Sequence, residues 1–346
     1  MRMRIKTVPR ILGMTGIAAL ILAAIPGTAT AAPTGSGGNH ICTGTSASPG
    51  TLAGNFANVT ITGTCLVDAG NVNVAGNLTV ANGASLVADF GQNDHTDSGT
   101  SNIRIAGNML VESGASVLLG CYPLQVSLWG GGAPPSLFTT PDFPCDDDPN
   151  AFPASGISTP TLSATESIGG SLISYDPLGT VVHNTTVRGS VVQYGGGNGT
   201  AYNPVGIFAV YIAGGPVQPN GLDTPIPLPA YSDYANVQTG GNMIVTGMDT
   251  SWYGIIRNTV RGNLIDTGNT TAPDGNETVS NVVWGNLVCS GNNPAVEYGD
   301  SNGLPNKVGG NATGECGFNV LLQNPSPLSV PGLPSYPLVH ISERLY

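Results

Sequence analysis

The densest group of side chains that could do chemistry is a run of carboxylates in a proline-rich stretch. Asp146, Asp147 and Asp148 follow Cys145 directly, and Asp142 lies shortly before it. Carboxylate oxygens are preferred ligands of Ca²⁺, which makes the four aspartates candidate metal ligands. The adjacent aspartates lack the alternating spacing of an EF-hand loop, and this favours a solvated loop. The sequence therefore predicts no cofactor, with Ca²⁺ at these residues as the alternative.

Aromatic side chains share this stretch with the carboxylates. Trp129, Phe138 and Phe143 lie within residues 122–161 and are candidate contacts for a glycan, because aromatic rings can stack on sugar rings. Aromatic residues in a long loop more often pin that loop to the body of the protein. Packing is therefore the favoured interpretation of these three residues.

Side chains typical of catalysis are scattered along the rest of the chain. Arg188 and Arg261 each directly precede a glycine of the repeat described below, but no carboxylate recurs at a fixed offset from both. The histidines His40, His183 and His340 lie far apart in the sequence. No Gly-x-Ser-x-Gly motif marks a nucleophilic serine. The sequence predicts no catalytic residue and favours a protein that is not an enzyme.

A short phrase repeated along the chain must build the scaffold that positions these groups. An apolar residue lies two places before Gly-Asn or Gly-Ser, and apolar alternation continues after it. The copies are VNVAGNLTV (72–80), IRIAGNMLV (103–111), ESIGGSLIS (166–174), TTVRGSVVQ (185–193), VQTGGNMIV (237–245), NTVRGNLID (258–266), NVVWGNLVC (281–289) and NKVGGNATG (306–314). Neighbouring copies are commonly about 22 residues apart, a period typical of one coil of a solenoid.

The alternation within each copy predicts short strands joined by sharp corners. Val72 and Val74 before Gly76, and Leu78 and Val80 after it, keep the same face inward. Glycine accepts a positive φ, which a sharp corner can require. We therefore expect an all-β, right-handed parallel β-helix. A β-sandwich is the alternative, but hairpin turns would not recur at this period with the same phrase on both sides.

Two proline-rich segments interrupt the repeat. Residues 122–161 and 203–230 cannot supply interior strands, because proline has no N–H to donate to a β-ladder. We expect both to be loops inserted into a single solenoid domain of residues 32–321, followed by a proline-rich tail of residues 322–346.

Six cysteines give an independent test of the solenoid. Nearest-neighbour pairing predicts the disulfides Cys42–Cys65, Cys121–Cys145 and Cys289–Cys316, each spanning about one coil. Residues one coil apart are separated by about 4.8 Å, the strand spacing, which suits a disulfide. Thiolate metal ligation is the alternative, but the sequence has no Cys-x-x-Cys pair.

The N-terminus and the charge balance indicate export. Residues 1–31 have the basic start, the apolar run and the small-residue end of a secretory signal peptide. The chain carries 10 basic and 21 acidic residues, a formal net charge of −11 at pH 7. This balance excludes nucleic acid as a partner, since too few cations remain to neutralise phosphates. We expect a secreted protein, extracellular or loosely attached to the cell surface, without a membrane span after signal cleavage.

The C-terminal repeats resemble a group of secreted actinobacterial proteins. The resemblance rests on Asn281–Cys289, Gly291–Pro294, Asn306–Asn311 and Cys316, and on Cys42 and Cys65 around Gly54-Asn55 near the start. The group has Gly-Asn repeats and no known function, so the resemblance implies bacterial origin and export and no site residues.

These observations favour a secreted, non-enzymatic structural or adhesive protein of the bacterial cell envelope or extracellular space. A cell-wall or extracellular polysaccharide is the partner we expect. The alternative is a carbohydrate-active β-helix enzyme or glycan-binding module that acts through residues 122–161.

Overall fold

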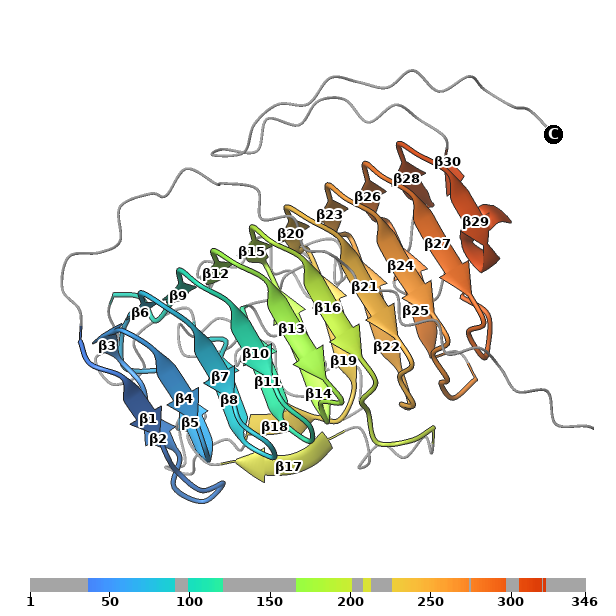
Figure 1. Ribbon diagram of the computed structural model, residues 1–346. Coiled ribbons are helices and arrows are strands. Elements are labelled where there is room, and N and C mark those ends of the chain that lie inside the picture. The colour runs from blue at the N-terminus through green and yellow to red at the C-terminus, as the bar shows by residue number, and fades with distance from the viewer. Residues whose placement is uncertain are drawn as a thin grey trace, which may run out of the picture. The chain divides into compact units, whose positions relative to one another are not determined.

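Short strands separated by tight corners wind into a parallel β-helix (Figure 1). The computed structural model describes residues 37–90, 99–120, 166–200, 208–212, 226–273, 275–296, 305–318 and 320–321. Successive strands join three parallel sheets in turn, so that β1 pairs with β4, β2 with β5 and β3 with β6. This topology is the predicted β-helix and excludes the β-sandwich.

The three sheets are named by their first strand. Sheet 1 comprises β1 (His40–Cys42), β4 (Val59–Ile61), β7 (Leu78–Val80), β10 (Met109–Val111), β13 (Leu172–Tyr175), β16 (Val191–Tyr194), β21 (Met243–Thr246), β24 (Leu264–Thr267), β27 (Leu287–Ser290) and β29 (Ala312–Gly314). Sheet 2 comprises β2 (Gly50–Thr51), β5 (Thr64–Leu66), β8 (Ser85–Ala88), β11 (Ser116–Leu119), β14 (Gly179–His183), β19 (Ser232–Ala235), β22 (Tyr253–Ile256) and β25 (Asn276–Val279). Sheet 3 comprises β3 (Gly54–Phe56), β6 (Val72–Val74), β9 (Ile103–Ile105), β12 (Glu166–Ile168), β15 (Thr185–Val187), β20 (Gln238–Thr239), β23 (Thr259–Val260), β26 (Val282–Val283), β28 (Asn306–Val308) and β30 (Val320–Leu321).

The alternating pattern of the repeat sorts side chains between the interior and the surface. Val72, Val74, Leu78 and Val80 are at most 1% exposed, whereas Thr79 between the last two is half-buried. Equivalent apolar residues from successive coils form one continuous core along the solenoid. Each buried valine or leucine contributes roughly 1.5 to 3 kcal/mol to stability.

The Gly-Asn corners join sheet 3 to sheet 1, and their glycines are required for a reason other than the predicted one. The glycines that the structure describes at a positive φ do not include Gly76, Gly107, Gly262 or Gly285. A Cβ at Gly262 would instead lie 2.4 Å from Oδ1 of Asn242 and 2.7 Å from the carbonyl oxygen of Gly241, both in the preceding coil. The expectation of a left-handed glycine at this corner is wrong, because close stacking of coils is what excludes a side chain.

Positive φ is required at the next corner, between sheets 1 and 2. Gly83, Gly114, Gly247, Gly268 and Gly291 have φ between 66° and 72°. No atom lies within 4 Å of a Cβ built on Gly268, so only backbone strain opposes a side chain there.

These two corners predict different costs for the same substitution. We expect Gly262→Ala to destabilise the protein by more than about 2 kcal/mol, because backbone atoms must move apart. Gly268→Ala should cost about 1 kcal/mol, the strain of a left-handed alanine. Urea unfolding of the two variants checks this order. Equal losses would show that the stacking contact at Gly262 relaxes freely.

A ladder of side-chain hydrogen bonds follows the Gly-Asn corners from coil to coil. Oδ1 of Asn58 accepts the N–H of Asn77 at 2.8 Å, and Oδ1 of Asn77 accepts the N–H of Asn108 at 2.8 Å. The same contact continues through Ser171, Ser190, Asn242, Asn263, Asn286 and Asn311. These corner side chains thus bond mainly to the backbone of the next coil. Each corner therefore fixes the register of its neighbour.

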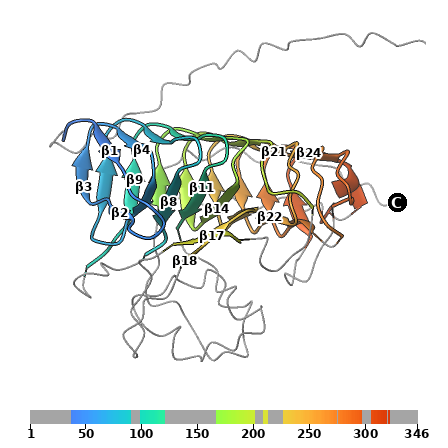
Figure 2. The same cartoon turned by 90° about the horizontal axis from the view of Figure 1, so that it is seen from below.

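The second proline-rich insertion contains strands as well as loop. Phe208–Ile212 (β17) and Ile226–Pro229 (β18) form an antiparallel pair outside the three parallel sheets, and Figure 2 shows it beneath the solenoid. Ile226 and Leu228 pack on an apolar cluster on the outer side of sheet 2 that includes Val87, Leu118 and Val181. The expectation that residues 203–230 form only loop is wrong for these strands, since prolines are tolerated in a two-stranded edge pair.

Disulfides close the first and last coils. Cys42 is bonded to Cys65 with a Cα–Cα distance of 6.3 Å, and Cys289 is bonded to Cys316 with a Cα–Cα distance of 5.3 Å. These are two of the predicted pairs, but their geometry differs from the expected vertical stack. Cys65 pairs in its sheet with Gly50, so the first disulfide crosses the interior from sheet 1 to sheet 2. Cys316 lies in the 3₁₀ helix η4 (Glu315–Phe318), and the pair Cys121–Cys145 lies outside the described residues.

Candidate functional site

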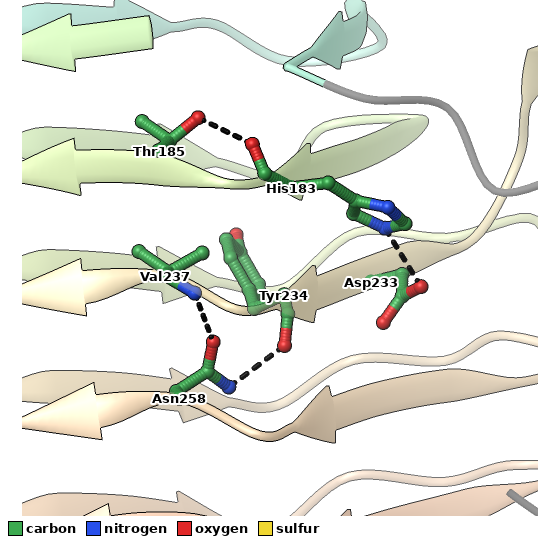
Figure 3. Close-up of polar contacts among 6 residues, drawn as sticks. All are labelled: His183, Thr185, Asp233, Tyr234, Val237 and Asn258. Carbon is green, nitrogen blue, oxygen red and sulfur yellow. Dashed lines mark hydrogen bonds and ion pairs between the residues drawn. The ribbon is translucent and has the colours of Figure 1, made fainter. Parts of the chain in front are cut away.

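Polar side chains inside the solenoid form a second asparagine ladder. Asn258 and Asn281 directly precede β23 and β26 of sheet 3, Asn306 is the first residue of β28, and all three occupy matching positions and are at most 1% exposed. Oδ1 of Asn258 accepts the N–H of Val237 at 2.8 Å, and its Nδ2 donates to the carbonyl oxygen of Tyr234 at 2.7 Å (Figure 3). Buried polar groups are stable only when bonded, and this ladder meets that condition. Its role is to hold the coils together.

A buried carboxyl lies near the C-terminal end of the same interior. The two carboxylate oxygens of Asp266 accept hydrogen bonds from the hydroxyls of Tyr253 and Thr278, each at 2.7 Å, and Nδ2 of Asn269 donates at 2.6 Å. Burial raises the pKa of Asp266 to about 6, and the hydrogen bonds from Thr278, Tyr253 and Asn269 oppose that rise. The group is fully enclosed and fully bonded, which indicates a structural role.

Four ionisable side chains gather at the corner between sheets 2 and 3. Asp89 follows β8, Glu166 opens β12, His183 ends β14 and Asp233 lies in β19; we call these four residues the acidic corner. Residues 91–98, which follow Phe90, and residues 121–165, which join Gly120 to Glu166, lie outside the described residues.

His183 and Asp233 form a close pair within the acidic corner. Nε2 of His183 lies 2.9 Å from Oδ2 of Asp233, on adjacent strands of sheet 2 (Figure 3). The backbone carbonyl of His183 accepts a hydrogen bond from the Thr185 hydroxyl at 2.7 Å, which fixes the turn. Tyr234, next to Asp233, points away from the histidine and into the core (Figure 3).

Asp89 and Glu166 carry carboxylate oxygens that no other described group satisfies. No other described residue forms a hydrogen bond with either oxygen of Asp89 or with Oε1 of Glu166, and all three atoms are buried, while Oε2 of Glu166 accepts the N–H of Ile103. Burial raises the pKa of Asp89 to about 7. A hydrogen bond from its own backbone N–H and the charge of His183 oppose that rise. Burial likewise raises the pKa of Glu166 well above its ordinary value, and the charge of Asp89 adds to the rise. These two acids therefore hold protons at a pH where ordinary carboxyls are ionised.

Raised carboxyl pKa values and a histidine–aspartate pair are the components of acid–base chemistry. The acidic corner is nevertheless closed, because Asp89, Glu166, His183 and Asp233 are each at most 4% exposed. In the part of the chain that the structure describes, no three His, Cys, Asp or Glu side chains converge closely enough to hold a metal ion. Among the described residues, this enclosed arrangement presents no open site to a substrate.

An aromatic group and a carboxylate do meet on the outer side of sheet 2. Nε1 of Trp252 donates to Oε1 of Glu277 at 3.3 Å, and the rings of Tyr231 and Trp252 pack edge to face with centroids 5.6 Å apart. Glu277 and Tyr231 are each 2% exposed. A glycan-processing groove needs an aromatic ring beside a carboxylate, but here the carboxylate is buried and Trp252 is half-buried, so the pair acts as packing.

The outer side of sheet 1 has a different character. Its central row runs unbroken over ten strands: Ile41, Thr60, Thr79, Leu110, Ile173, Val192, Ile244, Ile265, Val288 and Thr313. A second row lies beside its C-terminal half: Tyr175, Tyr194, Thr246, Thr267 and Ser290. We call these two rows the sheet 1 face. Apart from the two tyrosines, neither row contains an ionisable side chain.

Every exposed large hydrophobic residue that the structure describes lies on the sheet 1 face. These residues are Ile41 at 64%, Tyr175 at 50% and Tyr194 at 45% exposure. The two tyrosine rings stack with centroids 5.7 Å apart and an interplanar angle of 14°. Sequence reasoning missed this pair, although Tyr175 and Tyr194 occupy the same place in adjacent repeats.

Several sequence-predicted site residues lie outside the described residues. They are the calcium candidates Asp142, Asp146, Asp147 and Asp148 and the glycan candidates Trp129, Phe138 and Phe143. Of the two arginines beside corner glycines, Arg188 is exposed, and the Arg261 guanidinium lies 6.0 Å from the ring centroid of Trp284. His183 has a partner that the sequence did not reveal, because the 203–230 insertion separates it from Asp233.

The architecture defines a parallel β-helix closed by disulfides at both ends, and disulfides indicate an oxidising compartment. No family model, curated protein or solved structure matches this chain. Among the described residues, no helix has the length and apolar character needed to cross a bilayer.

Proposed function

We propose that this chain is a secreted, non-enzymatic β-helical protein that serves as a structural or adhesive element of the bacterial cell envelope or extracellular space. The observation that carries the proposal is the contrast between two sides of the solenoid. The acidic corner is enclosed, whereas the sheet 1 face gathers the exposed apolar side chains. Exposed apolar patches of this kind mark surfaces for association.

The scaffold supports a mechanical role. Parallel sheets of up to ten strands carry hydrogen bonds from coil to coil, and the corner asparagines add a further bond at most steps. A solenoid is weakest at its ends, where a coil has a neighbour on one side only. The disulfides Cys42–Cys65 and Cys289–Cys316 tie down those coils.

Cosedimentation with cell walls tests this function. The purified protein, with its disulfides intact, is incubated with insoluble walls from a Gram-positive actinobacterium, and the pellet and supernatant are assayed. We expect the protein in the pellet and no release of reducing sugar or soluble muropeptide over a day. Protein that stays in the supernatant, or that steadily releases sugar, would contradict the proposal.

A further inference from the structure

We propose that the sheet 1 face binds a neutral polysaccharide, with the stacked Tyr175 and Tyr194 as its principal contact. This inference rests on the proposed adhesive function and names its surface and its partner. The argument uses the regularity of the face, its lack of charge and the chemistry of its side chains.

The sheet 1 face is a straight surface with a fixed repeat. Ten strands pair in parallel, and the partner residues of the central row match one to one from Ile41 to Thr313. At about 4.8 Å per strand, the central row is about 43 Å long. A surface that is both straight and periodic fits an extended polymer better than a compact small molecule.

Charge selects a neutral partner over a charged one. The chain has a formal net charge of −11, which repels acidic polysaccharides and anionic membranes. The two rows of the face offer no cation to offset that repulsion. Glu112 lies beside Tyr175 in the preceding coil, where the second row would continue. Its Oε2 accepts a hydrogen bond from the N–H of Asn82 at 3.1 Å.

The side chains of the face match the two surfaces of a sugar. Aromatic rings offer an apolar face to the C–H side of a pyranose, and Tyr175 and Tyr194 are about half exposed. Side-chain amides and hydroxyls bond to sugar hydroxyls. Asn242, Asn263 and Asn286 line one border of the face, and the backbone ladder uses only their side-chain oxygens. One N–H of Asn263 donates to Oδ1 of Asn242 at 3.3 Å, and the remaining amide N–H groups can donate to sugar hydroxyls.

Pull-down on insoluble glycans tests the inference with a matched set of variants. The probes are microcrystalline cellulose and chitin as neutral polymers, with soluble polygalacturonate as an acidic competitor. The test variant is Tyr175→Ala/Tyr194→Ala. The control is Ser167→Ala/Thr186→Ala, which alters neighbouring half-buried positions of β12 and β15 on sheet 3. Tyr175→Phe/Tyr194→Phe keeps the rings and removes only the hydroxyls.

We expect the unaltered protein, the control and the phenylalanine variant to bind at least one neutral polymer with similar affinity. The alanine variant should bind at least tenfold more weakly. Raising NaCl from about 0.05 M to about 0.5 M should change the affinity less than twofold, because no charge pair is involved. Polygalacturonate should not compete.

A second substitution distinguishes a loss of binding from a loss of folding. Val192→Lys places a charge in the central row, on a side chain that already points outward, and should also weaken binding at least tenfold. Circular dichroism and urea unfolding verify that each variant is folded.

Three outcomes would overturn the inference. One is unchanged binding by the folded alanine and lysine variants. The second is a dimer that the alanine variant abolishes in the absence of glycan binding, which would assign the face to self-association. The third is binding to neutral phosphatidylcholine vesicles in place of glycans. If the alanine variant still pellets with cell walls, this inference fails and the proposed function stands; if the unaltered protein stays in solution, the proposed function fails.

Discussion

Raising the pH from about 5 to about 8 is expected to lower the free energy of unfolding. Three enclosed carboxyls have raised pKa values, Asp89 to about 7, Asp266 to about 6, and Glu166 well above its ordinary value. In the unfolded chain the same groups lose their protons near pH 4. Between these pH values the folded state therefore binds more protons than the unfolded state.

The sign of the effect follows from that difference. Stability contributed by these groups is fully present below about pH 4 and is lost as the pH rises through about 6 to 7. For a carboxyl such as Asp89, whose pKa rises from 3.8 to about 7, the loss is on the order of 4 kcal/mol at pH 8, since one pKa unit corresponds to about 1.4 kcal/mol. Maximum stability should thus lie on the acidic side of the usual range.

Urea unfolding at a series of pH values measures this dependence. Asp89→Asn removes one of the three titrations, so its stability should fall less steeply between pH 5 and pH 8. Asp249→Asn is the control, because Asp249 is an exposed carboxyl of the same scaffold. Stability that increases with pH over this range would show that the enclosed carboxyls are ionised in the fold.

The second large effect is expected for Asn281→Ala in the interior ladder. Oδ1 of Asn281 accepts the N–H and the Nδ2–H of Asn258, at 2.9 and 3.0 Å, and its Nδ2 donates to the carbonyl oxygen of Ile255 at 2.7 Å. Nδ2 also donates to Oδ1 of Asn306 at 2.9 Å. Alanine removes all four of these bonds and leaves the backbone N–H of Asn258 enclosed without its acceptor, whereas Asn258 Nδ2 keeps the Tyr234 carbonyl and Asn306 Oδ1 keeps the backbone N–H of residue 281. At about 1 kcal/mol for each lost bond, with the added penalty of about 1 to 3 kcal/mol for an enclosed unpaired group, a total loss above about 4 kcal/mol is expected.

Asn286→Ala provides a matched control in the same coil. Asn286 is exposed, and its side chain accepts one backbone bond, from the N–H of Asn311 at 2.9 Å. Water can replace that bond, so its loss should cost about 1 kcal/mol. Urea unfolding under oxidising conditions compares the two. Similar losses for Asn281→Ala and Asn286→Ala would mean that enclosure of the ladder does not determine its contribution.

The fold could be predicted from the sequence because the residues that determine it recur at a regular period. The Gly-Asn phrase recurs once per coil, and its flanking apolar residues keep the same face inward through the corner. The sequence also contains a periodic signal for the interior ladder, since Asn258, Asn281 and Asn306 each lie four residues before a corner glycine. It was missed because a buried asparagine and a turn asparagine look alike without the contacts of the neighbouring coil.

The corner glycines and the first disulfide have physical causes that the sequence alone does not reveal. The corner glycines are needed for close approach to the preceding coil, which depends on contacts between coils that local sequence does not contain. The cysteine spacing identified Cys42–Cys65, but the bond crosses between two sheets. A separation of one coil indicates that two cysteines lie close together, but it does not indicate whether they lie in the same sheet or in different sheets.

The candidate site was the least predictable part of the molecule. Asp89, Glu166, His183 and Asp233 come from four coils, and insertions of differing length separate them. No fixed spacing relates them, so only the strand pairing of sheet 2 and sheet 3 brings them together.

The end disulfides also determine how the solenoid responds to a pulling force. Without them, tension would peel a parallel β-helix from its ends, one coil at a time. The bonds Cys42–Cys65 and Cys289–Cys316 close loops with sequence separations of 23 and 27 residues, and a closed loop cannot lengthen. Load entering at either end bypasses those loops and reaches the interior coils directly, so extension of the terminal coils requires a reductant as well as a force.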